Sequence, residues 1–134
     1  MFISMEVIIN NNSYNVKCMV TDKDIKEGMK FKKFDSTFDG MMFMMGHGTH
    51  SFWMHECIIP LDIIFISHSD NSSKKHIISK IYSNCPPCRE ENPTDCTNYL
   101  GNGDIVLEIP GGDCIKYDIR IGDSVLIEGD SPES

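Results

Sequence analysis

The sequence of 134 residues contains no alanine and no glutamine, and it has a single tryptophan. Alanine is the best helix former, whereas isoleucine, which is plentiful in this chain, favours strands. We therefore expect an all-β domain, either a small closed or partly open β-barrel or a sandwich, with one short helix. The bias toward isoleucine, lysine, asparagine and methionine is also typical of AT-rich genomes, such as those of phages and streamlined bacteria.

Positive charge is scarce. The chain has 12 Lys and Arg against 20 Asp and Glu, which gives a formal net charge of -8 at pH 7. Proteins that bind nucleic acid neutralise phosphates with Lys and Arg, so we expect no nucleic-acid partner. The one basic concentration consists of Lys26, Lys30, Lys32 and Lys33, and we expect it to form a solvated face or loop.

Long apolar runs are also missing. No run reaches the roughly eighteen apolar residues of a transmembrane helix, so we expect no membrane span. The first ten residues, MFISMEVIIN, lack the basic region and the small-residue cleavage site of a signal peptide. As given, the sequence indicates a cytoplasmic protein, and a processed form of an exported protein fits it as well.

The length suits one domain, which we expect to cover residues 1–128, with a polar, frayed tail at 129–134. Two short β-type runs, Met5–Ile9 and Tyr14–Val20, are separated by asparagines, which tolerate the backbone of tight turns. The pattern predicts an opening hairpin. A second turn is expected at Asp70–Ser73.

A short helix is expected between Thr21, a typical N-cap residue, and Gly28, a typical stop. The strand Gly40–Met45 has apolar side chains on both faces, which predicts burial on both sides. Residues 47–51 are expected to form a glycine-containing loop. Short strands at this spacing favour a small barrel or sandwich.

A series of short motifs runs across roughly residues 4 to 128. They are Gly28-Met29 with Phe31, Gly40-Met41-Met42-Phe43, Phe52-Trp53-Met54, Pro60-Leu61-Asp62-Ile63-Ile64-Phe65-Ile66, Val106-Leu107-Glu108-Ile109 with Gly111-Gly112, and Gly122-Asp123. In this set and order the chain resembles domain-of-unknown-function family 192. The resemblance implies a compact β-barrel-like domain with little helix and no established biochemical function. The family usually has Lys-Asn-Thr after Trp-Met, where this chain has His55, Glu56 and Cys57.

Three residues are candidates for ligand contacts. Trp53 could stack on a ligand or belong to the core. Asp62 lies at the start of an apolar strand, where a carboxylate must be hydrogen-bonded or exposed; it either contacts a ligand or accepts backbone N–H groups. Glu108, between two apolar residues, faces either solvent or a polar pocket. We expect one shallow cleft lined by all three.

Three cysteines, Cys85, Cys88 and Cys96, lie close together in one long irregular segment. They suit a zinc site only if a fourth ligand comes from elsewhere, such as Cys114 or His76. A redox-active Cys-x-x-Cys normally needs a helix N-terminus that the sequence does not indicate. A disulfide between Cys88 and Cys96 that staples the loop is the preferred interpretation, and free thiols are the remaining one.

Histidines and sulfur-containing residues crowd around the tryptophan. His47, His50, His55 and Cys57, with methionines nearby, would suit copper(I) or another transition metal, although methionine is also a common core filler. A Cys57 nucleophile with His55 or His50 as its base is weaker, because neighbours along a strand point to opposite faces.

These patterns favour a binding domain for a small molecule or a protein partner, without catalysis and without a required cofactor. The rival interpretation is a metal-dependent hydrolase, or a zinc or copper module, that uses His47, His50 or the cysteine loop. A third is a structural or accessory interaction protein of phage type in which no pocket matters.

Overall fold

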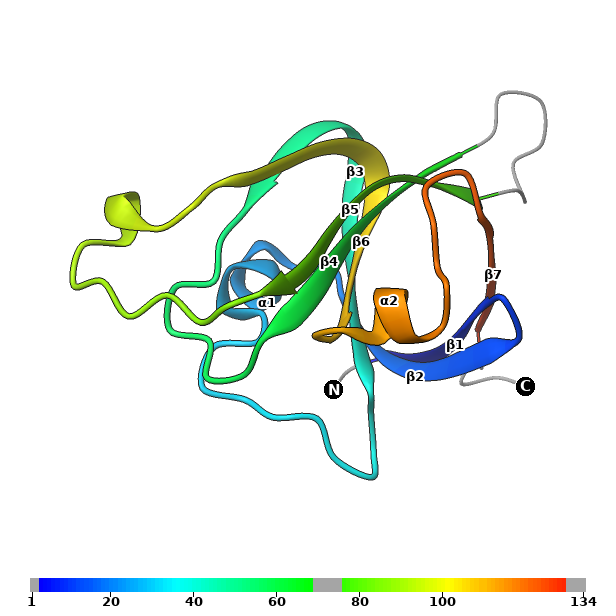
Figure 1. Ribbon diagram of the computed structural model, residues 1–134, viewed down its shortest axis with the longest axis horizontal. Coiled ribbons are helices and arrows are strands. Elements are labelled where there is room, and N and C mark those ends of the chain that lie inside the picture. Colours follow the sequence, from blue (N-terminus) through cyan, green and yellow to red (C-terminus); the bar gives the residue numbers. More distant parts are fainter. Residues whose placement is uncertain (1–2, 69–75, 130–134) are drawn as a thin grey trace.

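The computed structural model describes residues 3–68 and 76–129. Within these ranges seven strands form a closed barrel in the order β1-β2-β3-β6-β4-β5-β7, and the β2–β3 pair is its only parallel pair (Figure 1). The strands are β1 (Ile3–Ile9), β2 (Asn12–Met19), β3 (Gly40–Phe52), β4 (Leu61–His68), β5 (His76–Cys85), β6 (Tyr99–Pro110) and β7 (Ser124–Gly129). The helices are α1 (Asp22–Glu27), the 3-10 turn η1 (Pro93–Asp95) and α2 (Asp113–Lys116). The predicted all-β class is confirmed, and of the expected alternatives of a barrel and a sandwich the structure is a closed barrel.

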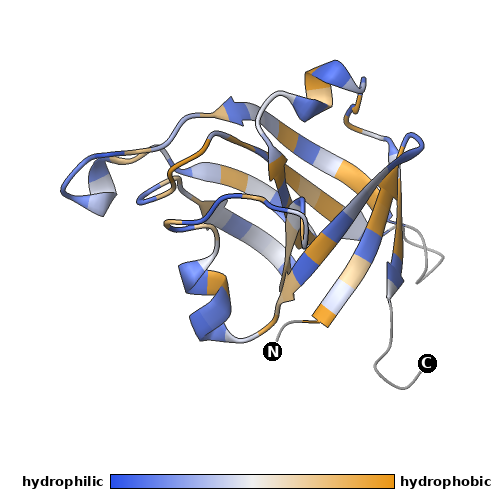
Figure 2. Ribbon diagram, turned by 90° about the horizontal axis from the view of Figure 1, so that it is seen from below, coloured by the Kyte–Doolittle hydropathy of each residue, from blue (hydrophilic) through white to orange (hydrophobic). Residues whose placement is uncertain are grey.

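The opening hairpin is also confirmed. β1 pairs antiparallel with β2, and Asn10 and Asn11 between them adopt φ values of 50° and 65°. Asparagine tolerates this left-handed backbone better than most residues, and two such residues in succession match the twist of the flanking strands. Along Ile3–Val7 of β1 and Ser13–Cys18 of β2 apolar residues alternate with polar ones, which Figure 2 shows as bands of opposite colour.

Strand β3 separates two hydrophobic cores. The side chain of Met42 belongs to the cluster inside the barrel, whereas Met41 and Phe43 belong to a second cluster on the outer face of the sheet. All three are almost completely buried, so the predicted burial on both faces is confirmed for this part of the strand. The outer cluster is covered by α1 and by the long loops that Figure 1 shows on one side of the barrel.

The prediction of a loop at residues 47–51 is wrong. β3 continues to Phe52, and its pairing with β6 shifts register between Met44 and Gly48. Gly46 lies within this irregularity at a φ of 79°, a backbone conformation that glycine adopts without strain. A bulge therefore carries the strand past the glycines that look like a loop in the sequence, and this extension brings Phe52 to the outer core.

Helix α2 was not predicted. It is only four residues long, which is too short for the periodic pattern that reveals a helix in a sequence, and its Cys114 packs into the barrel core. At the C-terminus Gly129, expected in the tail, pairs with Met5 as the last residue of β7. The rest of the expected tail and the turn expected at Asp70–Ser73 lie outside the described residues.

In the part of the chain that the structure describes, no helix is both long enough and apolar enough to cross a membrane.

Candidate functional site

Asp62 is fully buried, and three backbone N–H groups surround its carboxylate. Oδ1 accepts hydrogen bonds from the backbone nitrogens of Asn84 at 2.6 Å and Gly112 at 2.9 Å. Oδ2 accepts a hydrogen bond from the backbone nitrogen of Cys114 at 2.7 Å. These contacts tie the start of β4 to the end of β5 and to the first turn of α2, so this carboxylate has a structural role.

Asp62 and Glu108 do not share a cleft. In the antiparallel pair of β4 and β6, Asp62 lies opposite Ile109 and Glu108 lies opposite Ile63. Successive side chains of a strand point to opposite faces, so the two carboxyl groups lie on opposite sides of the sheet. The prediction that Trp53, Asp62 and Glu108 line a single cleft is therefore wrong for Asp62.

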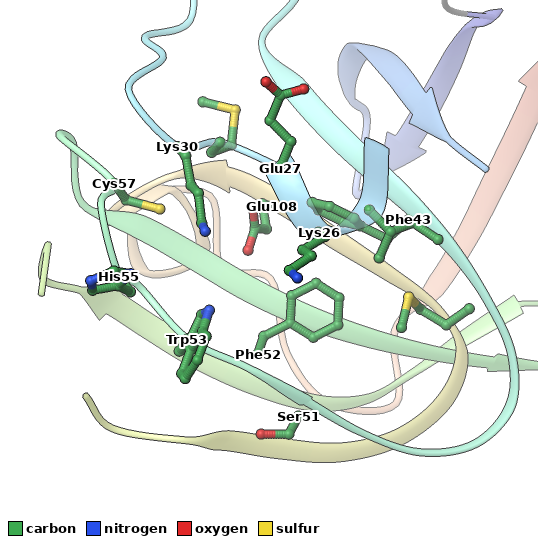
Figure 3. Close-up of a pocket in the computed structure, with 14 residues that line it drawn as sticks. Lys26, Glu27, Lys30, Phe43, Ser51, Phe52, Trp53, His55, Cys57 and Glu108 are labelled. Atoms are coloured by element: carbon green, nitrogen blue, oxygen red, sulfur yellow. The ribbon is translucent and has the colours of Figure 1, made fainter. Parts of the chain in front are cut away.

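Trp53 and Glu108 do line one cavity. It has a volume of about 250 Å³ and lies on the outer face of the barrel, between α1, β3 and the segment that follows β3 (Figure 3). Its lining consists of Ile25, Lys26, Glu27, Gly28, Met29, Lys30, Phe43, Met45, Ser51, Phe52, Trp53, His55, Cys57 and Glu108. Most of this lining comes from residues that are distant in the sequence from the β6 strand that carries Glu108.

Glu108 provides the floor of the cavity. Its side chain is 3% exposed, and its carboxyl group makes no hydrogen bond or ion pair with any described residue. Across the sheet it is flanked by Met41 on β3 and Ile63 on β4, which are both apolar. Burial raises the pKa of Glu108 from 4.5 to about 8, because the charged form is poorly solvated there. At neutral pH this carboxyl group is therefore mostly uncharged.

Aromatic rings and lysines form the walls. The rings of Phe43 and Phe52 pack edge to face with centroids 5.0 Å apart, and Trp53 remains 38% exposed. The side chains of Lys26 and Lys30 point into the cavity in Figure 3, and the Nζ of Lys30 is 3.5 Å from a carboxylate oxygen of Glu56 on the rim. In the sequence these lysines belong to the basic concentration that is expected to form a solvated face or loop.

Cys57 also lines the cavity. Its side chain is buried, and burial raises the pKa of the thiol to about 12, with a smaller contribution from nearby Glu108. The thiolate is the nucleophilic form of cysteine, so this environment disfavours nucleophilic chemistry. The Nδ1 of His55 is buried without a hydrogen bond, 3.5 Å from a carboxylate oxygen of Glu56. No hydrogen bond joins the described His55 ring to the Cys57 thiol.

The cysteine loop contains the preferred disulfide. Cys88 and Cys96 are bonded to each other, while the thiol of Cys85 is buried and donates to the carbonyl oxygen of Tyr82. The three sulfur atoms therefore do not form a zinc site. The disulfide loop supports the cavity wall, because the backbone nitrogen of Cys88 donates to the carbonyl oxygen of Met54 at 3.0 Å.

The histidines of the extended β3 strand do not converge. His47 is 92% exposed, with its Nδ1 3.5 Å from Asp104, and the Nε2 of His50 is 2.7 Å from the carbonyl oxygen of Gly46. Among the described residues no group of three or more His, Cys, Asp or Glu side chains could hold a metal ion.

Solved structures share the fold. A protein of unknown function from Novosphingobium aromaticivorans DSM 12444 matches with a TM-score of 0.70 and 26% identity, over 92% of this chain and 84% of that chain. A protein from Sinorhizobium meliloti 1021, described as a proposed transcription regulator, matches with a TM-score of 0.73 and 21% identity, over 96% and 94% of the two chains. A search of curated proteins found no match.

The family model described as Uncharacterized ACR (DUF192) matches residues 5–127. This range contains all the cavity-lining residues and includes nearly the whole barrel. The chain therefore belongs to domain-of-unknown-function family 192.

Proposed function

We propose that this protein binds a small molecule in the cavity above Glu108 and does not catalyse a reaction on it. The observation that carries the proposal is the carboxyl group of Glu108, which is buried at the floor of a cavity and has no hydrogen-bond partner among the described residues. A net hydrogen bond contributes roughly 0.5–1.5 kcal/mol. A ligand in the cavity that hydrogen-bonds this group would gain free energy of that order on binding.

The lining of the cavity supports a small-molecule ligand rather than a protein partner. Ligand sites combine apolar and aromatic walls with a few polar groups that set orientation, and typical volumes start near roughly 300 Å³. Here Phe43, Phe52 and Trp53 supply aromatic surface, while Glu108 supplies a polar group at the floor. A volume of about 250 Å³ suits a compact ligand of one ring or a short chain.

Binding without catalysis is favoured by the state of the neighbouring groups. The thiol of Cys57 is held in its unreactive protonated form by burial. The ring of His55 lies beside Glu56 and lacks a hydrogen bond at Nδ1, so no pair of residues at the cavity resembles a nucleophile oriented by a base.

The proposal is tested by blocking the cavity. Ser51, an exposed lining residue on β3, is replaced in the variant Ser51→Phe, and the matched control Ser83→Phe lies on β5 away from the cavity. A library of small molecules is screened by thermal shift and by fluorescence of the single tryptophan. We expect compounds that stabilise the protein and change Trp53 fluorescence to lose both effects in Ser51→Phe and to keep them in the control. Compounds that bind both variants equally would contradict the proposal.

A further inference from the structure

We infer that the ligand of this cavity is a small organic carboxylate, whose anionic group lies between Lys26, Lys30 and the carboxyl group of Glu108. The inference rests on the proposed function and specifies its ligand class. The apolar body of the ligand would pack against Phe52 and Trp53. The aromatic walls would accept ligands of either charge. The side chains of Lys26, Lys30 and Glu108 are what favour a negatively charged ligand.

The chain carries a formal net charge of -8, yet two lysine side chains point into its candidate cavity (Figure 3). Lys26 forms no ion pair with any described residue, and Lys30 is paired with Glu56 at the rim at 3.5 Å. Glu27, which also lines the cavity, directs its carboxylate away from Glu108 in Figure 3. Lys26 therefore places at the cavity a positive charge that no described carboxylate pairs with, and the carboxylate of a ligand could pair with it.

A charged Glu108 would repel a bound carboxylate, but its burial between Met41 and Ile63 keeps it mostly uncharged. An uncharged carboxyl group has one O–H donor, and a hydrogen bond from it to a carboxylate is among the stronger kinds in proteins. The indole nitrogen of Trp53 faces the same space in Figure 3 and can donate a further hydrogen bond. Donors thus surround the position of the ligand oxygens.

A cationic ligand is the main alternative, because aromatic rings and a carboxylate also attract ammonium groups. It is disfavoured for two reasons. A cation would lie beside the side chains of Lys26 and Lys30, and it would require Glu108 to ionise in a site where burial opposes its charge.

Other ionisable groups also face this site. Lys26 and Glu27 come from α1, and Lys30 follows that helix. His55, Glu56 and Cys57 come from the segment after β3, and Cys85 is the last residue of β5. Burial raises the pKa of the Cys57 thiol to about 12 and that of the Cys85 thiol to about 11, so neither titrates between pH 6 and pH 9.

The first experiment compares three probes of similar shape: phenylacetate, 2-phenylethanol and 2-phenylethylamine. Their dissociation constants are measured by Trp53 fluorescence and by NMR titration of the whole chain. We expect phenylacetate to bind about tenfold or more tightly than the alcohol, a difference typical of a charge-assisted hydrogen bond, and the amine to bind most weakly. Lys26→Met and Lys30→Met should each weaken phenylacetate binding several-fold, whereas Lys33→Met, outside the cavity lining, should leave it unchanged.

The second experiment uses pH and the variant Glu108→Gln. Phenylacetate affinity should fall as the pH rises through about 8, by up to tenfold per pH unit above that value, because Glu108 is then ionised in the free protein and must take up a proton before it can donate to the ligand. The amide of Glu108→Gln keeps a donor but cannot ionise. This variant should therefore still bind phenylacetate, and the fall in affinity above pH 8 should disappear. Circular dichroism checks that it is folded.

The outcomes separate the inference from the proposed function. If the amine binds most tightly and Glu108→Gln abolishes binding, the carboxylate inference is overturned and the cavity remains a binding site. The carboxylate inference is also overturned if the three probes bind equally. It is overturned as well if other compounds bind and lose their binding in Ser51→Phe, while none of the three probes binds in this way. If nothing binds in a manner sensitive to Ser51→Phe, both the inference and the proposed function fail.

Discussion

Asp62 and Glu108 lie on neighbouring strands one residue out of register, and their carboxyl groups therefore point to opposite faces of the same sheet. Both are buried, but Asp62 accepts three backbone hydrogen bonds, whereas Glu108 has no hydrogen-bond partner among the described residues. One carboxyl group therefore stabilises the end of the barrel, and the other is available to a ligand. This difference leads to separate experimental consequences.

Asp62→Asn should destabilise the fold. The amide has only one oxygen, and its NH₂ group would face a backbone N–H that now donates to the carboxylate. We expect the free energy of unfolding to fall by about 2–4 kcal/mol, because hydrogen bonds to charged groups contribute more than neutral ones. Urea denaturation measures it. The control Asp95→Asn, at an exposed site, should change it by less than about 0.5 kcal/mol. Equal stabilities of the two variants would contradict the structural role of Asp62.

Glu108 should make stability depend on pH in a defined window. Its pKa is raised from 4.5 to about 8 in the folded protein, so between these values the folded state keeps a proton that the unfolded state releases. The free energy of unfolding should therefore decrease as the pH rises from about 4.5 to about 8, and this contribution should level off above that. The difference in the free energy of unfolding between the wild type and Glu108→Gln isolates this contribution, and urea denaturation at several pH values from 4 to 9 measures it. We expect a change on the order of a few kcal/mol in favour of the variant. A pH-independent difference would contradict the burial of Glu108.

The disulfide gives a countable prediction. The structure has one disulfide, Cys88–Cys96, and four free cysteines. Alkylation in denaturant followed by mass spectrometry should therefore label four thiols without reductant and six with it, when the protein is kept under oxidising conditions. The double variant Cys88→Ser and Cys96→Ser should be less stable by about 2–3 kcal/mol, as expected for a short loop. Equal thiol counts with and without reductant would exclude the disulfide in that sample.

The free thiols should be unreactive in the native protein. Cys57 lies in the cavity, but its thiol is buried and its pKa is raised to about 12, so little thiolate is present at neutral pH. Iodoacetamide should label Cys57 far more slowly in the native protein than in denaturant, with peptide mapping to identify the site. Rapid native labelling of Cys57 would show an activated thiol and would reopen the possibility of nucleophilic chemistry at the cavity.

Local patterns in the sequence predicted much of the barrel. The asparagines between β1 and β2 identified the hairpin, and the apolar run from Met41 to Phe43 identified a strand buried on both faces. The extension of β3 past Gly46 and the four-residue helix α2 were missed. The first depends on pairing with the distant strand β6, and the second is too short to have a period.

The candidate site was only partly predictable for a related reason. The sequence identified Trp53 and Glu108 as candidates, and the fold brings them to one cavity. It could not show that Asp62 points away, because the register of β4 against β6 is a long-range property and both strands are apolar on both faces. The lysines were visible as a basic concentration, but their approach to β6 depends on how α1 covers the outer core.

The most direct test of the cavity as a carboxylate site is the titration of the Glu108 carboxyl carbon by NMR in glutamate-labelled protein, with Glu108→Gln to assign the signal. In the free protein this carbon should titrate with a pKa of about 8, and saturating phenylacetate should move the titration to still higher pH. A Glu108 signal that titrates in the ordinary range of glutamate, or one that phenylacetate leaves unmoved, would contradict a buried, uncharged Glu108 that donates to a bound carboxylate.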